Sequence, residues 1–187
     1  MLKKKIIHIK SFFLFLLVFC FSPSVIIAEF ASWPDKGDSL YIQMDSIESC
    51  RIDSFLMELR IDSILAFAKT LLGVPYHYSG TTPAGFDCSG FTAYVFSHFG
   101  IQVPHGSSDL ITYGIPVEKE SLKPGDLVLF KSRNAASNRI RHVGIITENS
   151  VNGIFFIHAS VYNGITIYPL DHPYYINRYI AGRRLVY

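Results

Sequence analysis

One cysteine and two histidines have the residue types of a nucleophilic hydrolase. Cys88 stands in the run Phe-Asp-Cys-Ser-Gly-Phe, and the apolar residues at positions 91, 95 and 99 fall four apart on one helical stripe. The partial positive charge at a helix N-terminus favours the thiolate, which is the nucleophilic form of cysteine. We therefore expect an ionised Cys88 at a helix start. A small cysteine that only packs the helix start is the alternative.

A nucleophilic cysteine needs an imidazole that takes its proton and passes it to the leaving group. His142 and His158 lie in two β-type runs joined by turn residues over 148–152. If residues whose numbers sum to 300 pair across this hairpin, the two histidines lie opposite each other, with Cβ atoms about 5 Å apart, and one ring can orient the other. A polar strand start for His142 and a hydrogen-bonded core position for His158 are the alternatives.

The same three side chains could in principle ligate zinc. The sequence contains neither Cys-x-x-Cys nor His-Glu-x-x-His, and the candidate ligands come from three distant segments. Nucleophilic catalysis is therefore favoured, and we expect no metal and no cofactor. The other histidines of the domain fall in loops or at a helix end and are expected to be solvated, namely His77, His98, His105 and His172.

The predicted secondary structure changes along the chain from helices to strands. Apolar residues recur at helical spacing from about Asp53 to Leu72, where Gly73 and Pro75 end the pattern. Beyond residue 126, β-branched and aromatic runs alternate with turn residues. Helices followed by strands indicate an α+β domain over 59–187, with N-terminal helices packed on an antiparallel sheet of about five strands.

The N-terminus has the pattern of an export signal. A basic stretch over 1–10 precedes a short apolar run, and Ala28 supplies a small residue for cleavage. The run is shorter than the roughly 20 residues of a membrane helix, so we interpret 1–28 as a cleaved signal peptide that leaves no stable membrane span. An uncleaved anchor is the alternative. Lipidation at Cys20 is disfavoured because a bulky phenylalanine precedes it.

The net charge of the predicted mature protein argues against nucleic acid as a partner. Removing the four lysines of the signal leaves 13 basic side chains against 15 acidic ones, a formal charge of about −2, which gives no electrostatic case for nucleic acid.

The turn-rich residues 29–58 are interpreted as a linker or pro-segment. Cys50 could pair with Cys88 in an oxidising compartment, but a free Cys88 is favoured. We expect a monomer.

Five motifs follow one another along the chain. They are Leu72-Gly73-Val74-Pro75-Tyr76, Phe86-Asp87-Cys88-Ser89-Gly90-Phe91, Leu122-Lys123-Pro124-Gly125-Asp126-Leu127-Val128, Arg141-His142-Val143-Gly144-Ile145 and Ile157-His158-Ala159-Ser160. In this order they resemble the NlpC-type cell-wall cysteine peptidases. The likeness extends from about residue 60 to 187, and the ordered set is far more specific than any one motif.

The resemblance implies a papain-like fold and a role for each matching residue. Cys88 would be the nucleophile, His142 the general base and acid, and His158 the group that orients His142. Tyr76 would support the oxyanion together with the Cys88 backbone N–H. Asp87 and Ser89 match positions that contact substrate in some members.

Two positions depart from the family pattern, and both bear on substrate preference. Ser79-Gly80 stands where a glycine pair is common, and His105 stands where an arginine is common.

The resemblance also implies a substrate, the stem peptide of peptidoglycan. The expected reaction is hydrolysis of the bond between γ-D-glutamate and the diamino acid, in the periplasm or cell envelope. An amidase or acyltransferase on the same Cys/His scaffold is one alternative, because fold does not fix reaction. A catalytically inactive wall-binding module is the other, with Cys88 locked to Cys50.

Overall fold

The computed structural model describes the backbone of residues 38–132 and 139–186, and side chains from residue 47 onward. The chain divides into two compact units, residues 1–49 and 50–187, and the second contains every strand. The α-helices are α1 (Asp38–Thr70), α2 (Cys88–Ser97) and α3 (Pro173–Ile176), and short 3₁₀ turns lie at Asp109–Thr112 and Lys119–Ser121. The strands are β1 (Thr81–Thr82), β2 (Gly85–Phe86), β3 (Ile115–Val117), β4 (Leu127–Lys131), β5 (Ile140–Ser150), β6 (Gly153–Ser160), β7 (Gly164–Pro169) and β8 (Tyr179–Arg184).

The main sheet has six strands in the order β3-β8-β4-β5-β6-β7, and every neighbouring pair is antiparallel. Strands β4 to β7 follow one another through the sheet, and β8 returns from the far end of the chain to pair between β3 and β4. Strands β1 and β2 form a separate small hairpin. The α+β fold is confirmed, with one strand more than the five expected.

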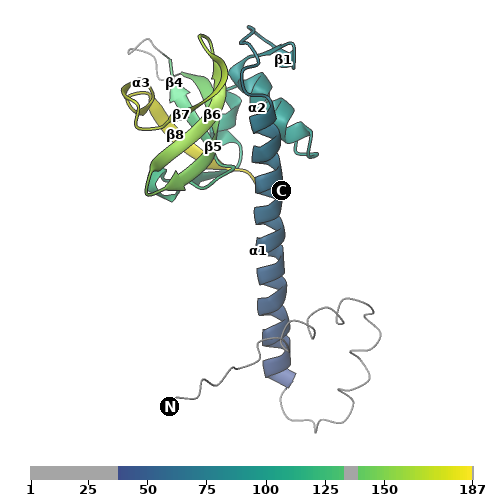
Figure 1. Ribbon diagram of the computed structural model, residues 1–187. Helices are drawn as coiled ribbons and strands as arrows, with labels where there is room; N and C mark the ends of the chain where they lie inside the picture. The colour runs from purple at the N-terminus through teal and green to yellow at the C-terminus, as the bar shows by residue number, and fades with distance from the viewer. Residues whose placement is uncertain (1–37, 133–138, 187) are drawn as a thin grey trace, which may run out of the picture. The chain divides into compact units, whose positions relative to one another are not determined.

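Helix α2 packs on one face of this sheet, against β5 and β6, and the C-terminal turns of α1 lie beside α2 (Figure 1). Apolar side chains of both helices meet alternate residues of the central strands in one core, which includes Ile64, Phe91, Leu129, Val143 and Ile157. Alternation along each strand sends every second side chain to this face. The Phe67 ring stacks on His98 at 3.9 Å, which fixes α1 to the end of α2.

The opposite face of the sheet carries a second, smaller core. Its aromatic members are Phe130, Phe156 and Tyr175, and the short helix α3 supplies Tyr175. Because the sheet is covered on both faces, strands β4 and β6 and the middle of β5, residues 143–146, are largely apolar and do not alternate cleanly between apolar and polar residues.

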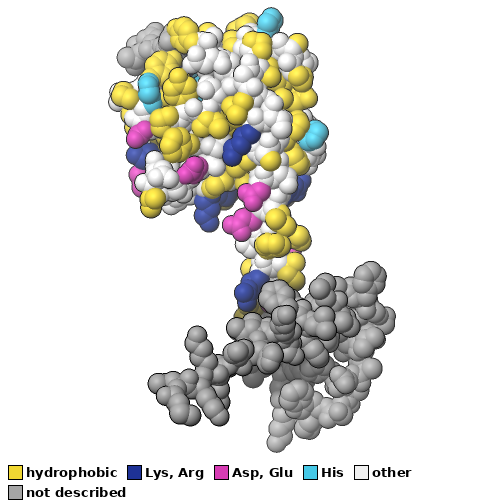
Figure 2. Space-filling model, in the orientation of Figure 1, with side chains coloured by type: hydrophobic (Ala, Val, Ile, Leu, Met, Phe, Trp, Pro, Cys, Tyr) yellow, Lys and Arg dark blue, Asp and Glu magenta, His cyan; other side chains and the backbone are white. Residues whose placement is uncertain are grey.

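Helix α1 starts earlier than its apolar spacing indicates. We expected the helix from about Asp53, but it begins at Asp38, within the segment interpreted as linker or pro-segment. The sequence contains no glycine or proline from Asp38 to Leu72, so nothing interrupts the helix before Gly73. The turn around Phe55 is exposed although it is apolar, and Figure 2 shows apolar side chains on this part of the surface.

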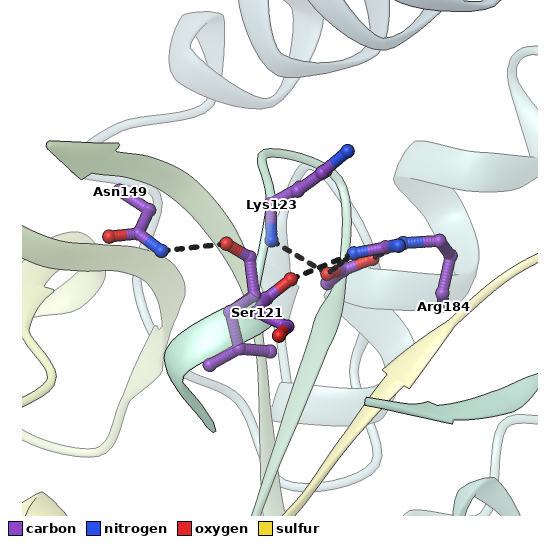
Figure 3. Close-up of polar contacts among 6 residues, drawn as sticks. Ser121, Lys123, Asn149 and Arg184 are labelled. Atoms are coloured by element: carbon purple, nitrogen blue, oxygen red, sulfur yellow. Dashed lines mark hydrogen bonds and ion pairs between the residues drawn. The ribbon is translucent and has the colours of Figure 1, made fainter. Parts of the chain in front are cut away.

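A buried ion pair ties β8 to the loop before β4. Arg184 donates from Nε to Oδ1 of Asp126 at 2.8 Å and from Nη2 to Oδ2 at 2.7 Å. Asp126 is 2% exposed and also accepts from the Lys123 backbone N–H at 2.7 Å, while Asn149 binds the Leu122 carbonyl oxygen (Figure 3). The Pro-Gly-Asp motif thus has a structural role, far from the histidines.

No helix within residues 38–132 and 139–186 is long and apolar enough to cross a membrane. The predicted signal peptide 1–28, with Cys20, lies outside the described residues.

Candidate active site

An open cleft of about 460 Å³ contains the three residues that the sequence singled out. Its wall includes Cys88, His142, His158 and Tyr76, which come from α2, β5, β6 and the loop before β1. The volume lies in the range of small-ligand sites. Cys88 is at the first position of α2, as predicted, and its Sγ lies 3.9 Å from the carbonyl oxygen of Arg141, the residue before His142.

The first turn of α2 is held by its own cap. Asp87 is the N-cap residue, and its Oδ1 accepts from the Gly90 backbone N–H at 2.6 Å. The Ser89 hydroxyl donates to the same oxygen at 3.2 Å, so Asp87 and Ser89 lie next to Cys88 and face each other. Any Cβ at Gly90 would collide with the Gly80 carbonyl oxygen. The close approach of the 79–87 loop to the helix start therefore requires this glycine.

The thiol is neutral at rest, so the expectation of an ionised Cys88 is wrong for the free protein. Burial, and then the charge of Asp87, raise the pKa of Cys88 to about 11. The backbone N–H groups of Cys88, Ser89 and Val143 act in the opposite direction, as a helix start should, but they do not compensate. Position at a helix N-terminus does not ionise a thiol that is only 8% exposed.

The two histidines are in direct contact, although the predicted register was wrong. His142 Nε2 and His158 Nδ1 are 2.8 Å apart. Strands β5 and β6 pair with Ile145 opposite Ile157, which places His158 opposite Gly144 if the register continues. A bulge between Ile146 and Glu148 shifts the pairing beyond it.

The observed contact is therefore diagonal across the two strands, a spacing that long side chains can bridge. Because the register differs from the prediction by an even number, both rings stay on the same face of the sheet. Gly144 also has a packing role here, since a Cβ at this position would collide with the Phe156 ring.

A tyrosine that sequence reasoning missed extends this chain of contacts. Tyr175 Oη lies 3.1 Å from His158 Nε2, and His158 is fully buried. A neutral imidazole has one N–H and one acceptor nitrogen. If His142 donates from Nε2 to His158 Nδ1, then His158 carries its proton on Nε2 and donates to Tyr175. This arrangement leaves His142 Nδ1 unprotonated, which is the state of a general base.

Burial keeps both rings neutral. It lowers the pKa of His142 well below its usual value, and the nearby His158 and Arg178 act in the same direction. It also lowers the pKa of His158 to about 4, against the opposing effect of a backbone hydrogen bond at Ala159. Tyr175 is held protonated, because burial raises its pKa to about 12.

Tyr76 is held near the segment that leads into α2. Its backbone bridges to Phe86, two residues before Cys88, and its ring lines the same cleft. Burial raises the pKa of Tyr76, and the charge on Cys88 is the next cause. Its hydroxyl therefore stays protonated and is available as a hydrogen-bond donor near the reacting atoms.

The two positions that depart from the family pattern both have local consequences. Ser79 has φ 55°, a left-handed conformation that glycine adopts without strain. His105 Nε2 lies 3.7 Å from Asp87 Oδ1, so protonated His105 would form an ion pair with the α2 cap. Of the other histidines expected to be solvated, His98 stacks on Phe67, and His172 lines the cleft and caps α3.

Cys50 and Cys88, the cysteines of the described part of the chain, do not form a disulfide with each other. Cys50 is exposed on α1 and Cys88 is buried, and both are free thiols. Within the described residues, no group of three or more His, Cys, Asp or Glu side chains is arranged to hold a metal ion.

Fold and site together define a papain-like α+β domain with a Cys-His-His arrangement in its cleft. The NlpC/P60 family profile matches residues 73–184, so the chain belongs to the NlpC/P60 family.

Two similar proteins have names that describe different reactions. The γ-D-glutamyl-L-lysine dipeptidyl-peptidase of Bacillus cereus is 35% identical over 123 residues, which cover 66% of this chain and 36% of that protein. The murein DD-endopeptidase MepS/murein LD-carboxypeptidase of Escherichia coli K12 is 36% identical over 115 residues, covering 61% and 57%. The chain thus spans about a third to just over half of these relatives.

Solved structures share the fold. The crystal structure of an NlpC/P60 family protein from Bacillus cereus aligns with a TM-score of 0.62 at 33% identity, covering 68% of this chain and 40% of that one. A protein of the same family from Staphylococcus aureus, described as similar to a lipoprotein, aligns with a TM-score of 0.60 at 29% identity, covering 68% and 41%.

Proposed function

We propose that this protein is a cysteine peptidase that hydrolyses the bond between γ-D-glutamate and the diamino acid of peptidoglycan stem peptides. The observation that carries the proposal is the contact of His142 Nε2 with His158 Nδ1 in the cleft that Cys88 lines. The Bacillus cereus relative, named for a γ-D-glutamyl-L-lysine bond, supports this choice of substrate.

The acylation step starts from a neutral pair. His142 Nδ1 takes the thiol proton of Cys88 as the sulfur attacks the γ-carbonyl carbon, because the thiol does not ionise by itself near neutral pH. The carbonyl becomes a tetrahedral oxyanion, which the Cys88 backbone N–H and the Tyr76 hydroxyl stabilise. His142 then gives the proton to the amine of the diamino acid, the C–N bond breaks, and a thioester remains.

Deacylation reverses the proton transfers. A water molecule loses a proton to His142 Nδ1 and attacks the thioester carbon, the S–C bond breaks, and the sulfur regains its proton. His158 keeps His142 in the required tautomer throughout. Asp87 and Ser89 adjoin the nucleophile and are placed to contact the acyl part of the substrate.

Incubation with defined muropeptides tests which bond the protein hydrolyses. A panel should contain the γ-D-glutamyl bond, a D,D cross-link and an L,D-carboxypeptidase bond, because the relatives' names cover all three. Mass spectrometry should find free L-alanyl-γ-D-glutamate and a new amine on the diamino acid. Cleavage only at the D,D or L,D bond would reject the substrate. Acyl transfer to an added amine would favour the acyltransferase alternative, and no product at all would favour the inactive wall-binding module.

Export agrees with such a substrate, and we propose that residues 1–28 direct it. Cell fractionation and N-terminal sequencing of the purified protein test this. A mature protein that begins at residue 29 in the periplasm or cell envelope is expected, whereas an intact N-terminus in the cytoplasm would contradict it.

A further inference from the structure

The cleft is lined by positively charged side chains and by no acidic ones among the described residues. Among the described residues that line it, Arg141 and Arg178 are the arginines, and none is an aspartate or a glutamate. Arg141 belongs to β5, and Arg178 follows α3 just before β8, so two segments far apart in the sequence bring cations to the same cleft. Asp87 is not part of this lining; it is the N-cap residue of α2, directly before Cys88.

Arg178 is held in a fixed orientation. Its Nε and Nη2 donate to the Lys131 carbonyl oxygen at 3.0 and 2.6 Å. Its guanidinium carbon also lies 4.6 Å from the centre of the Tyr174 ring, in a cation–π arrangement. A guanidinium has more N–H donors than these two, and the remaining ones have no acceptor among the described residues. A pre-oriented cation with unused donors can bind a carboxylate without first being ordered.

Arg178 and His142 line the same cleft, and the charge of Arg178 acts on the His142 ring, where it opposes protonation. In the proposed function, on which this step rests, His142 hands its proton to the departing amine of the diamino acid. In that function the diamino acid lies next to His142, in the cleft that Arg141 and Arg178 also line.

We propose that Arg178 and Arg141 form a carboxylate-binding site for the leaving diamino acid, and so determine which stem peptides are cut efficiently. Two carboxylates have this chemistry. One is the free α-carboxylate at the end of a tripeptide stem, and the other is the second carboxylate of diaminopimelate, which lysine lacks.

Four synthetic substrates distinguish between these two carboxylates. Each carries L-alanyl-γ-D-glutamate joined to L-lysine, to L-lysine amide, to diaminopimelate amidated only at its α-carboxyl, or to diaminopimelate amidated at both carboxyls. The variants are Arg178→Gln, Arg141→Gln and the double substitution, and Arg51→Gln on the exposed part of α1 is the matched control. Thermal denaturation shows which variants are folded.

The expected result is a loss in kcat/KM of about tenfold or more, through KM, on a substrate that carries a carboxylate, with less than about a twofold change on its amide partner. A loss confined to the lysine pair would identify the α-carboxylate as the bound group, and a loss confined to the diaminopimelate pair would identify the second carboxylate. Equal losses on acid and amide substrates would overturn the proposal, because they would mean that Arg178 either only clamps Lys131 or binds the free α-carboxylate of γ-D-glutamate, which all four substrates carry. If Arg178→Gln does not fold, Arg141→Gln carries the test alone, since its side chain is exposed. Failure of the unsubstituted protein to cut any of the four would instead reject the proposed function.

Discussion

Replacing Asp87 by asparagine should make Cys88 more reactive toward alkylating agents. The charge of Asp87 is the second cause, after burial, of the raised pKa of Cys88. Asparagine removes this charge and keeps an oxygen that can accept from the Gly90 N–H, so the cap of α2 is retained. The thiolate becomes easier to form, and the pKa of Cys88 should fall below about 11.

The size of the effect follows from the thiolate population. At pH 7, a thiol with a pKa of about 11 is ionised in roughly one molecule in 10⁴, whereas one at the ordinary 9.0 is ionised in roughly one in 100. This difference corresponds to about 3 kcal/mol against the thiolate. Each unit by which the substitution lowers the pKa should therefore raise the thiolate population at pH 7 about tenfold. The alkylation rate should rise about threefold, because a thiolate of lower pKa is a weaker nucleophile.

The assay is alkylation by iodoacetamide between pH 5 and 11, followed by mass spectrometry of the peptide that contains Cys88. In the unsubstituted protein the rate should still climb at pH 9, and Asp87→Asn should move the whole curve to lower pH. Asp62→Asn, an exposed site on α1, removes an equal charge away from the cleft and should leave the curve in place. A rate that is already constant from pH 5 upward would refute the neutral thiol, because it would require a resting thiolate–imidazolium pair.

Four further results are expected. Tyr175→Phe removes the acceptor of His158 Nε2, so kcat should fall about tenfold with KM unchanged, and nitrogen NMR should show an altered histidine tautomer; an unaltered spectrum would reject the role. The folded pKa of His158, about 4, lies below its ordinary 6.5, so the folded state binds fewer protons between these values. The free energy of unfolding should therefore drop by about 3 kcal/mol from pH 7 to pH 4, and His158→Asn should reduce that slope in urea titrations. Ser79→Gly relieves a left-handed backbone and should raise stability by about 1 kcal/mol, whereas a lower melting temperature would contradict the strain. Asp126→Ala leaves Arg184 without its buried partner and should cost about 3 kcal/mol in denaturant unfolding, with a cost near zero arguing against the pair.

Residue type and order were enough to predict the fold class and to find the residues that meet in the cleft. Cys88 could be placed at a helix start because the apolar spacing after it is local information. The contact of His142 with His158 could be anticipated because the two residues belong to consecutive strands of one hairpin, so little intervening sequence has to be interpreted. The register could not, since the turn occupies residues 151–152 instead of 148–152, and the bulge between Ile146 and Glu148 then changes the pairing again without a clear signature in the sequence.

The properties that depend on tertiary burial escaped prediction. The helix N-terminus suggested a thiolate, but the buried setting of Cys88 reverses the direction of the pKa shift. Tyr175 and Arg178 lie in α3 and just beyond it, and only the return of β8 to its place between β3 and β4 brings them into the cleft with the histidines. A polar aromatic run near the C-terminus does not by itself indicate either position.

The central claim is that the sulfur of residue 88 performs the reaction. The most direct measurement is the rate at which Cys88→Ala releases fragments from a purified stem peptide, compared with Cys50→Ser, which alters only the exposed thiol. The account predicts no release by Cys88→Ala and full release by Cys50→Ser. Release by a folded Cys88→Ala protein at the unsubstituted rate would contradict it.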